Sequence, residues 1–144
     1  MYLKKDTPIK NKRTKYKNFY NWVINFTDKN STFSIYYQTE LHLDFQIVFN
    51  RSLFATKLFP FREDFFFEYK KRYNLLYGKN EILNQMKISS LTYYQKLTPK
   101  NFIDFSNIYS LDYIIIEKEH KTLFKKYNPV FQNNYFYVYD INNL

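Results

Sequence analysis

The stretch 50–78 constrains the fold most, because it marks a short strand, a turn and both ends of a helix. Pro60 prevents a helix from entering this stretch from its N-terminal side, since proline has no backbone N–H and its ring clashes with the preceding turn. Two acidic residues then place negative charge where a helix N-terminus is partly positive. Gly78 is the single glycine of the chain, and it stands where a left-handed residue commonly follows a helix. The pattern predicts a strand near 52–57 and a helix over about 62–77.

The N-terminal half carries one helical and one strand pattern. Residues 15–27 place apolar side chains at i, i+3, i+4 and i+7, which predicts an amphipathic helix. Residues 32–37 alternate between apolar and polar, which predicts the first strand of the core. Residues 41–50 alternate like a strand, yet they occupy a connection between parallel strands that needs a helix, so we expect a short irregular helix there. The helical stripe of 15–27 consists of Phe19, Trp22, Val23 and Phe26.

The C-terminal half carries three local signals. Thr98 can cap a helix and Pro99 suits its first position, so together they predict a helix through about residue 109. Residues 111–117 contain three consecutive isoleucines, which predict a strand buried on both faces at the centre of a parallel sheet. Two asparagines separate two extended runs within 129–141, and asparagine tolerates the positive φ of a tight turn. These runs predict a β-hairpin.

This order of elements predicts one α/β domain over residues 18–144. We expect three layers, with helices on both faces of a mostly parallel sheet of about five strands. The C-terminal hairpin would add an antiparallel edge to that sheet. Residues 1–17 form a basic polar arm without an apolar stripe, so we expect the arm to add little to the core.

Most of the positive charge lies in this arm. The formal net charge of the chain is +9, and residues 1–17 contain seven basic residues and one acidic residue. Such an arm suits nucleic acid or an anionic membrane surface, and it equally suits contact with solvent alone. No apolar run approaches the roughly 20 residues of a membrane span, and the start of the chain lacks the apolar core of a signal peptide. A cytoplasmic location therefore stays open.

Several kinds of site are excluded by residue type. The chain has no cysteine, which excludes disulfides, thiolate metal sites and a cysteine nucleophile. A single glycine excludes glycine-rich phosphate loops and the nucleophile elbow of hydrolases. His42 and His120 have no spacing typical of metal ligands. We therefore expect no metal, no cofactor and no catalytic residue.

Candidate ligand-facing residues follow the predicted parallel strands. In open α/β sheets, ligands bind beyond the carboxyl ends of the strands. The ends here carry polar side chains, and they predict a binding site at that edge of the sheet. The candidates from this rule are Gln38, Glu40, Lys57, Glu117 and His120.

Two other functions remain as alternatives on the residues alone. Glu117, Glu119 and His120 offer acid and base groups for a compact enzyme, although a charged loop after a buried strand explains them more simply. Basic clusters at 70–72 and 125–126 lie near aromatic residues, as in proteins that bind nucleic acid. The simpler explanation of 70–72 is that it complements the negative end of the predicted helix.

Five segments follow one another in a suggestive order, namely WVINFTDKNSTFSI, RSLFATKLFPF, FFFEYKKRY, DYIIIEK and PVFQNNYFYVYDI. Their order and spacing, over about Phe19 to Ile141, resemble the C-terminal soluble domain of polytopic bacterial membrane proteins. The family in question is the glycosyltransferase-like, mannosyltransferase-like class, with its uncharacterised relatives. No single motif is specific, and the resemblance rests on the set.

The resemblance implies a membrane-associated, extracytoplasmic accessory domain that is not itself an enzyme. In such proteins the membrane part holds the lipid-linked donor and the catalytic carboxylate. The implied partners are a glycan, a polytopic membrane protein, or the anionic membrane surface through residues 1–17. Arg51, Lys57 and Arg62 match basic positions of the pattern, which adds Arg51 to the ligand-facing candidates, whereas Gln46 stands where relatives often carry a basic residue. A small basic protein that binds nucleic acid is the alternative.

Overall fold

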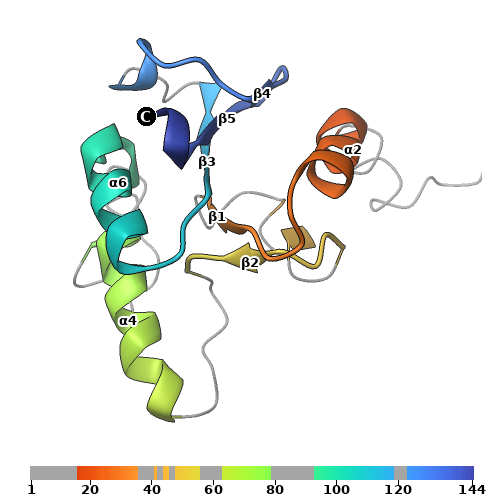
Figure 1. The fold of residues 1–144 in the computed structure, drawn as a ribbon. Coiled ribbons are helices and arrows are strands. Elements are labelled where there is room, and N and C mark those ends of the chain that lie inside the picture. Colours follow the sequence, from red (N-terminus) through yellow and green to blue (C-terminus); the bar gives the residue numbers. More distant parts are fainter. Residues whose placement is uncertain are drawn as a thin grey trace, which may run out of the picture.

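A computed structural model describes residues 16–35, 41, 44–45, 48–55, 63–78, 93–118 and 123–144. Within these ranges the chain forms a five-stranded mixed sheet with helices packed against it (Figure 1). The predicted α/β class is therefore confirmed. No helix in these ranges combines the length and apolarity that a membrane crossing requires.

The strands lie in the order β2-β1-β3-β5-β4. β1 pairs in parallel with β2 and β3, whereas β5 pairs antiparallel with β3 and with β4. The sheet is thus mixed: β2, β1 and β3 form the predicted parallel part, and β5 and β4 continue it in antiparallel pairing. The strand of the three isoleucines is central, as expected, between the first strand and the C-terminal pair. The strands are β1 Thr32–Ser34, β2 Ser52–Leu53, β3 Tyr113–Glu117, β4 Phe131–Gln132 and β5 Phe136–Asp140.

Strand β3 is buried on both faces. Ile114 and Ile116 belong to a hydrophobic cluster that includes side chains of α4 (Glu63–Tyr77) and α6 (Pro99–Ile108). Ile115 points the other way, into a cluster that includes side chains of α2 (Lys17–Phe26). All three isoleucines are at most 4% exposed, because successive side chains of a strand point to opposite faces. In Figure 1, α2 accordingly lies on one side of the sheet, and α4 and α6 lie on the other.

The two best-marked helix ends are as predicted. α4 ends before Gly78, which has a φ of +90° and donates its N–H to the Asn74 carbonyl at 3.0 Å. Thr98 caps α6, since its Oγ1 accepts the N–H of Asn101 at 3.3 Å while Asn101 Oδ1 accepts the N–H of Thr98 at 2.8 Å. Both ends rest on contacts between residues close in sequence, which is why the sequence alone reveals them.

The predicted stripe of α2 needs one correction. Phe19 and Val23 are fully buried, but Phe26 is 74% exposed. Phe26 is the last residue of the helix, and the guanidinium of Arg51 donates to the Val23 and Thr27 carbonyls of that turn. Arg51 therefore occupies the buried position beside the end of the helix, and Phe26 faces outward.

The connection between β1 and β2 is described only in part. The N–H groups of Val48 and Phe49 both donate to the Asp44 carbonyl, at 2.8 and 2.9 Å, which is a helical pattern. Leu41, Phe45 and Phe49 are buried at spacings of four residues. This agrees with the irregular helix expected there, although residues 36–40, 42–43 and 46–47 lie outside the described ranges.

We expect Ile115→Ala to lower the free energy of unfolding by about 2 to 5 kcal/mol, because it leaves a cavity at the centre of the sheet. The matched control is Ile24→Ala on α2, which is 52% exposed and should change stability by less than about 0.5 kcal/mol. Urea denaturation of both variants measures the difference. Equal losses would contradict the central position of β3.

We expect Tyr139→Phe to be tolerated at pH 7 and to protect the protein at high pH. The hydroxyl of Tyr139 is buried and finds no hydrogen-bond partner in the described part of the chain. Burial raises the pKa of Tyr139 to about 12, from 10 in the unfolded chain. The folded state therefore holds this proton more tightly than the unfolded state does. The free energy of unfolding of the wild-type protein consequently falls as the pH rises from 10 toward 12. Urea denaturation at pH 7 and at pH 11 should show a smaller alkaline loss for the phenylalanine variant; equal losses would contradict the burial of this hydroxyl.

Candidate functional site

The structure describes two of the six ligand-facing candidates. Gln38, Glu40, Lys57 and His120 lie outside the described residues. Glu117 is the last residue of β3, is partly buried and pairs with Phe136 of β5. Arg51 immediately precedes β2, which runs parallel to β1 and, through it, to β3. Arg51 and Glu117 consequently lie at opposite ends of the sheet and are not brought together.

Arg51 has a structural environment. It is 6% exposed, and its guanidinium makes five hydrogen bonds to protein oxygens. These bonds connect the end of α2 to the start of β2, and the carbonyl oxygens at a helix C-terminus attract a cation. The acceptors are the Thr27 hydroxyl at 3.2 Å and the carbonyls of Val23 at 3.2 Å, Thr27 at 3.0 Å, Phe49 at 2.9 Å and Asn50 at 3.5 Å. The guanidinium thus serves the packing of α2 against the sheet.

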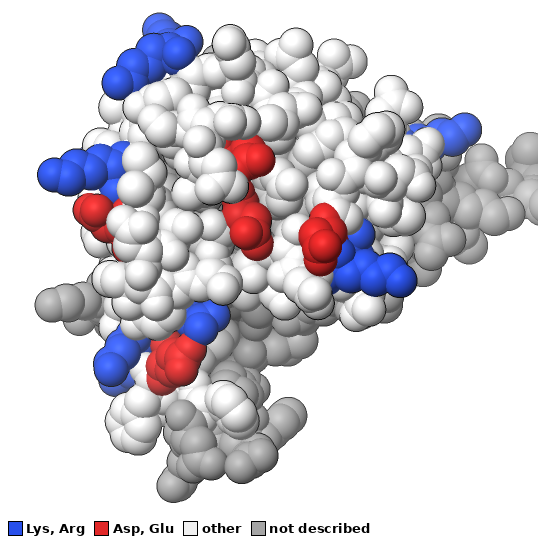
Figure 2. All heavy atoms as spheres, viewed as in Figure 1, with Lys and Arg blue, Asp and Glu red and all other residues white. Residues whose placement is uncertain are grey.

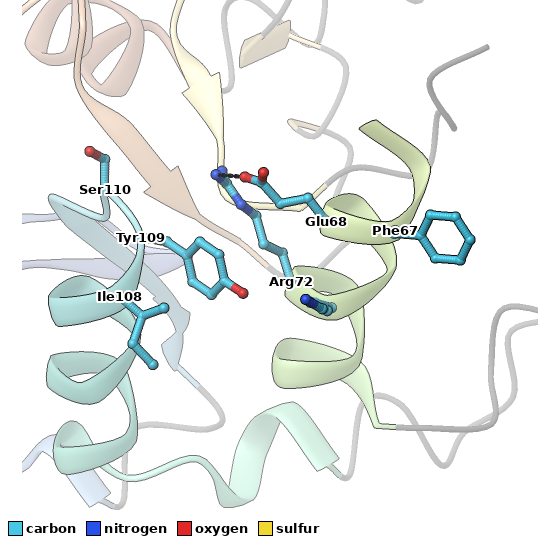
Figure 3. Close-up of a pocket in the computed structure, with 7 residues that line it drawn as sticks. Phe67, Glu68, Arg72, Ile108, Tyr109 and Ser110 are labelled. Atoms are coloured by element: carbon cyan, nitrogen blue, oxygen red, sulfur yellow. Dashed lines mark hydrogen bonds and ion pairs between the residues drawn. The ribbon is translucent and has the colours of Figure 1, made fainter. Parts of the chain in front are cut away.

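An open pocket lies between α4 and the end of α6 (Figure 3). Its volume is about 530 Å³. α4 contributes Phe67, Glu68, Lys71 and Arg72, while Ile108, Tyr109 and Ser110 come from the end of α6 and the residues after it. We name this feature the α4–α6 pocket. It combines two cations, one carboxylate, two hydroxyls and an apolar wall.

The guanidinium of Arg72 lies over the faces of two aromatic rings. Its carbon lies 4.8 Å from the ring centroid of Tyr109 and 5.8 Å from that of Phe54. Such contacts favour a cation, because the face of an aromatic ring is electron-rich. Figure 3 shows the Arg72 side chain extending from α4 past the Tyr109 ring toward Glu68. The side chain of Arg72 is fixed by two rings, and 28% of its surface is still exposed.

The edge of the same guanidinium is only partly used. One terminal nitrogen of Arg72 donates to a carboxylate oxygen of Glu68, one helical turn earlier in α4. The Nε atom of Arg72 is buried and finds no hydrogen-bond acceptor among the described residues. A buried donor without an acceptor costs roughly 1 to 3 kcal/mol. The described residues thus leave one donor of this guanidinium without an acceptor.

The basic cluster at 70–72 is placed differently from the simpler sequence prediction. α4 continues to Tyr77, and its last turn contains no basic residue. The cluster therefore lies in the body of the helix, where it does not complement the C-terminus. In the view of Figure 2, basic and acidic side chains of the described residues are interspersed and form no continuous basic surface.

Only part of this pocket is indicated by the sequence. Glu68 and Arg72 are four residues apart on a predicted helix, a spacing that brings two side chains together. Tyr109 and Ser110 join them because α6 packs beside α4, a long-range contact that no local pattern shows. In the part of the chain that the structure describes, no three His, Cys, Asp or Glu residues are grouped to hold a metal ion.

Comparisons with known proteins found no match for this chain among protein-family models, curated proteins or solved structures. The interpretation of the α4–α6 pocket accordingly rests on its own geometry. That geometry provides groups that bind by charge, hydrogen bonding and stacking.

The two arginines should differ in their effect on stability. We expect Arg51→Met to lower the free energy of unfolding by roughly 2 to 4 kcal/mol, because it leaves buried carbonyls without donors. Arg72→Met is the matched control and should cost about 1 kcal/mol or less, since its ion pair with Glu68 lies at the surface. Guanidinium chloride denaturation tests this. An Arg72 variant that loses as much as the Arg51 variant would assign both residues to the packing of the fold.

Proposed function

We propose that the chain is a non-catalytic accessory domain, related to the soluble part of membrane glycosyltransferase-like proteins, that contacts a glycan or a membrane subunit. In this proposal the domain is membrane-associated and extracytoplasmic. Its architecture is a three-layer α/β domain with a C-terminal antiparallel hairpin. Two hydrophobic clusters on opposite faces of the sheet and the antiparallel pairing of β4 with β5 support that architecture.

The α4–α6 pocket is the observation that carries the proposal. A glycan presents many hydroxyls and an apolar ring face, and binding sites for such ligands combine a few placed polar groups with apolar surface. Tyr109 and Ser110 supply hydroxyls, Lys71 and Arg72 supply donors, and Ile108 is 68% exposed at the apolar wall. The pocket therefore favours the glycan over the membrane subunit as the contact made here.

The groups of the pocket also support a binding role. Nucleophilic catalysis needs a nucleophile within hydrogen-bond reach of a base, and general acid–base catalysis needs a titratable group that is available for proton transfer. The carboxylate of Glu68 is instead paired with the guanidinium of Arg72, which is always protonated. The ion pair between Glu68 and Arg72 orders the pocket for binding.

Binding of the purified chain to an array of immobilised neutral and acidic oligosaccharides tests the proposal. Ser110→Trp fills the pocket mouth at an exposed position, and we expect it to reduce binding by about tenfold or more, the loss typical of a blocked central contact. Asn21→Trp is the control, since Asn21 is exposed on α2 across the sheet.

Two outcomes would contradict the proposal. One is that no oligosaccharide binds, or that Ser110→Trp and Asn21→Trp bind alike. The other is a DNA gel shift that is sensitive to salt, independent of sequence and lost on removing residues 1–17. That result would favour the alternative, a small basic protein that binds nucleic acid.

A further inference from the structure

We infer that the ligand of the α4–α6 pocket carries an oxyanion, a carboxylate or a phosphate, which binds Arg72 in the place that Glu68 occupies in the free protein. This inference rests on the proposed function and specifies its ligand class as an acidic glycan or a sugar phosphate. Both sources share one chemistry, namely an anionic group with two oxygens that can bind a guanidinium edge to edge.

The contrast between the two arginines points to Arg72. Arg51 is 6% exposed and makes five hydrogen bonds within the protein, so its donors are already used for structure. Arg72 makes one hydrogen bond, to Glu68, among the described residues, and its Nε lacks an acceptor. Both residues have the same side chain, so the difference is one of placement. Arg72 therefore has one donor that no described residue satisfies, beside the donor that Glu68 occupies.

The rings around Arg72 determine how a ligand can approach. The guanidinium carbon of Arg72 lies over the faces of the Tyr109 and Phe54 rings, which provide no oxygen acceptor, so the N–H groups of Arg72 need acceptors from elsewhere. A carboxylate or phosphate prefers the edge of a guanidinium, because it can accept from two nitrogens at once. Glu68 accepts from one terminal nitrogen. A ligand oxyanion that accepts from Nε as well would satisfy the buried donor.

The carboxylate of Glu68 is one that a ligand oxyanion can displace from Arg72. Its side chain is 53% exposed, and ion pairs at four-residue spacing on a helix surface are weak. Lys71 lies three residues after Glu68 on α4 and lines the same pocket. At this spacing it can pair with the Glu68 carboxylate once that carboxylate leaves Arg72.

The charges of the pocket support an anionic ligand. Its charged lining residues are Glu68, Lys71 and Arg72, which leave one positive charge unbalanced. A single negative charge on the ligand balances the site, whereas a neutral sugar leaves it positive. Charge complementarity of this kind contributes to specificity more than to raw affinity.

Isothermal titration calorimetry with glucuronate, glucose 1-phosphate, inorganic phosphate and glucose tests the inference. We expect the wild-type chain to bind glucuronate or glucose 1-phosphate more tightly than glucose. Arg72→Met should weaken that binding roughly 10- to 100-fold, because it removes charge-assisted hydrogen bonds. Lys70→Met is the matched control: it removes the same charge two residues away, at an exposed position outside the pocket lining, and should leave binding nearly unchanged.

Glu68→Gln provides the sharper test, because a gain in affinity cannot result from misfolding. Removing the competing carboxylate should tighten binding of the acidic ligand by roughly 2- to 5-fold. Preference for glucuronate over both phosphates would identify a carboxylate as the group bound, and the reverse preference would identify a phosphate.

Three results would overturn the inference. Glucose could bind as tightly as the acidic sugars at a site that Ser110→Trp blocks, in which case the proposed function stands and the oxyanion does not. Lys70→Met could weaken binding as much as Arg72→Met, which would show attraction to surface charge in general. Glu68→Gln could weaken binding, which would make Glu68 a ligand contact instead of a competitor.

Discussion

The structure depends on the burial of β3 on both of its faces. Ile114 and Ile116 are covered from the side of α4 and α6, and Ile115 is covered from the side of α2. A strand with isoleucines on both faces does not suit a sheet that has one face in solvent, because the uncovered face would expose large aliphatic side chains to water. Helices are therefore required on both sides. The parallel pairing with β1 on one edge of β3 requires a crossover connection, whereas the antiparallel pairing with β5 on the other edge does not.

Large aromatic rings fill most of this core, and their hydroxyls set a second constraint. A buried hydroxyl needs a hydrogen-bond partner. Tyr77 of α4 donates to the Ile35 carbonyl at 2.7 Å, and Tyr94 donates to the Ile115 carbonyl at 3.1 Å while lying 3.1 Å from the Ser34 hydroxyl. The Tyr94 bonds reach the middle of β3 and the end of β1. The Tyr77 bond holds the end of α4 against the residue after β1, and α4 carries part of the α4–α6 pocket lining.

The sequence predicted those parts of the fold that local chemistry determines. Gly78 and Thr98 mark helix ends through contacts within a few residues, and the isoleucines of β3 indicate burial by composition alone. The exposure of Phe26 was not predictable, because the buried position beside the last turn of α2 is occupied by Arg51, which lies 25 positions later in the sequence. The candidate site was missed for the same reason: the two rings beside Arg72 come from the residue after β2 and the residue after α6, and the sequence shows Arg72 only as one of three adjacent cations.

The two arginines are distinguished by how many of their donors are already hydrogen-bonded to the protein, and this is more informative than their positions in the sequence. Arg51 matched a pattern of basic residues and looked like a ligand contact, yet its environment uses the guanidinium to join two elements of the fold. Arg72 looked like an ordinary surface cation, yet two rings fix it while one buried donor stays unused. A charge that the fold has already satisfied stabilises the fold, whereas a charge that is fixed but unsatisfied is organised in advance for a ligand. By that criterion the proposed binding site lies between α4 and α6, apart from Glu117 at the end of the central strand.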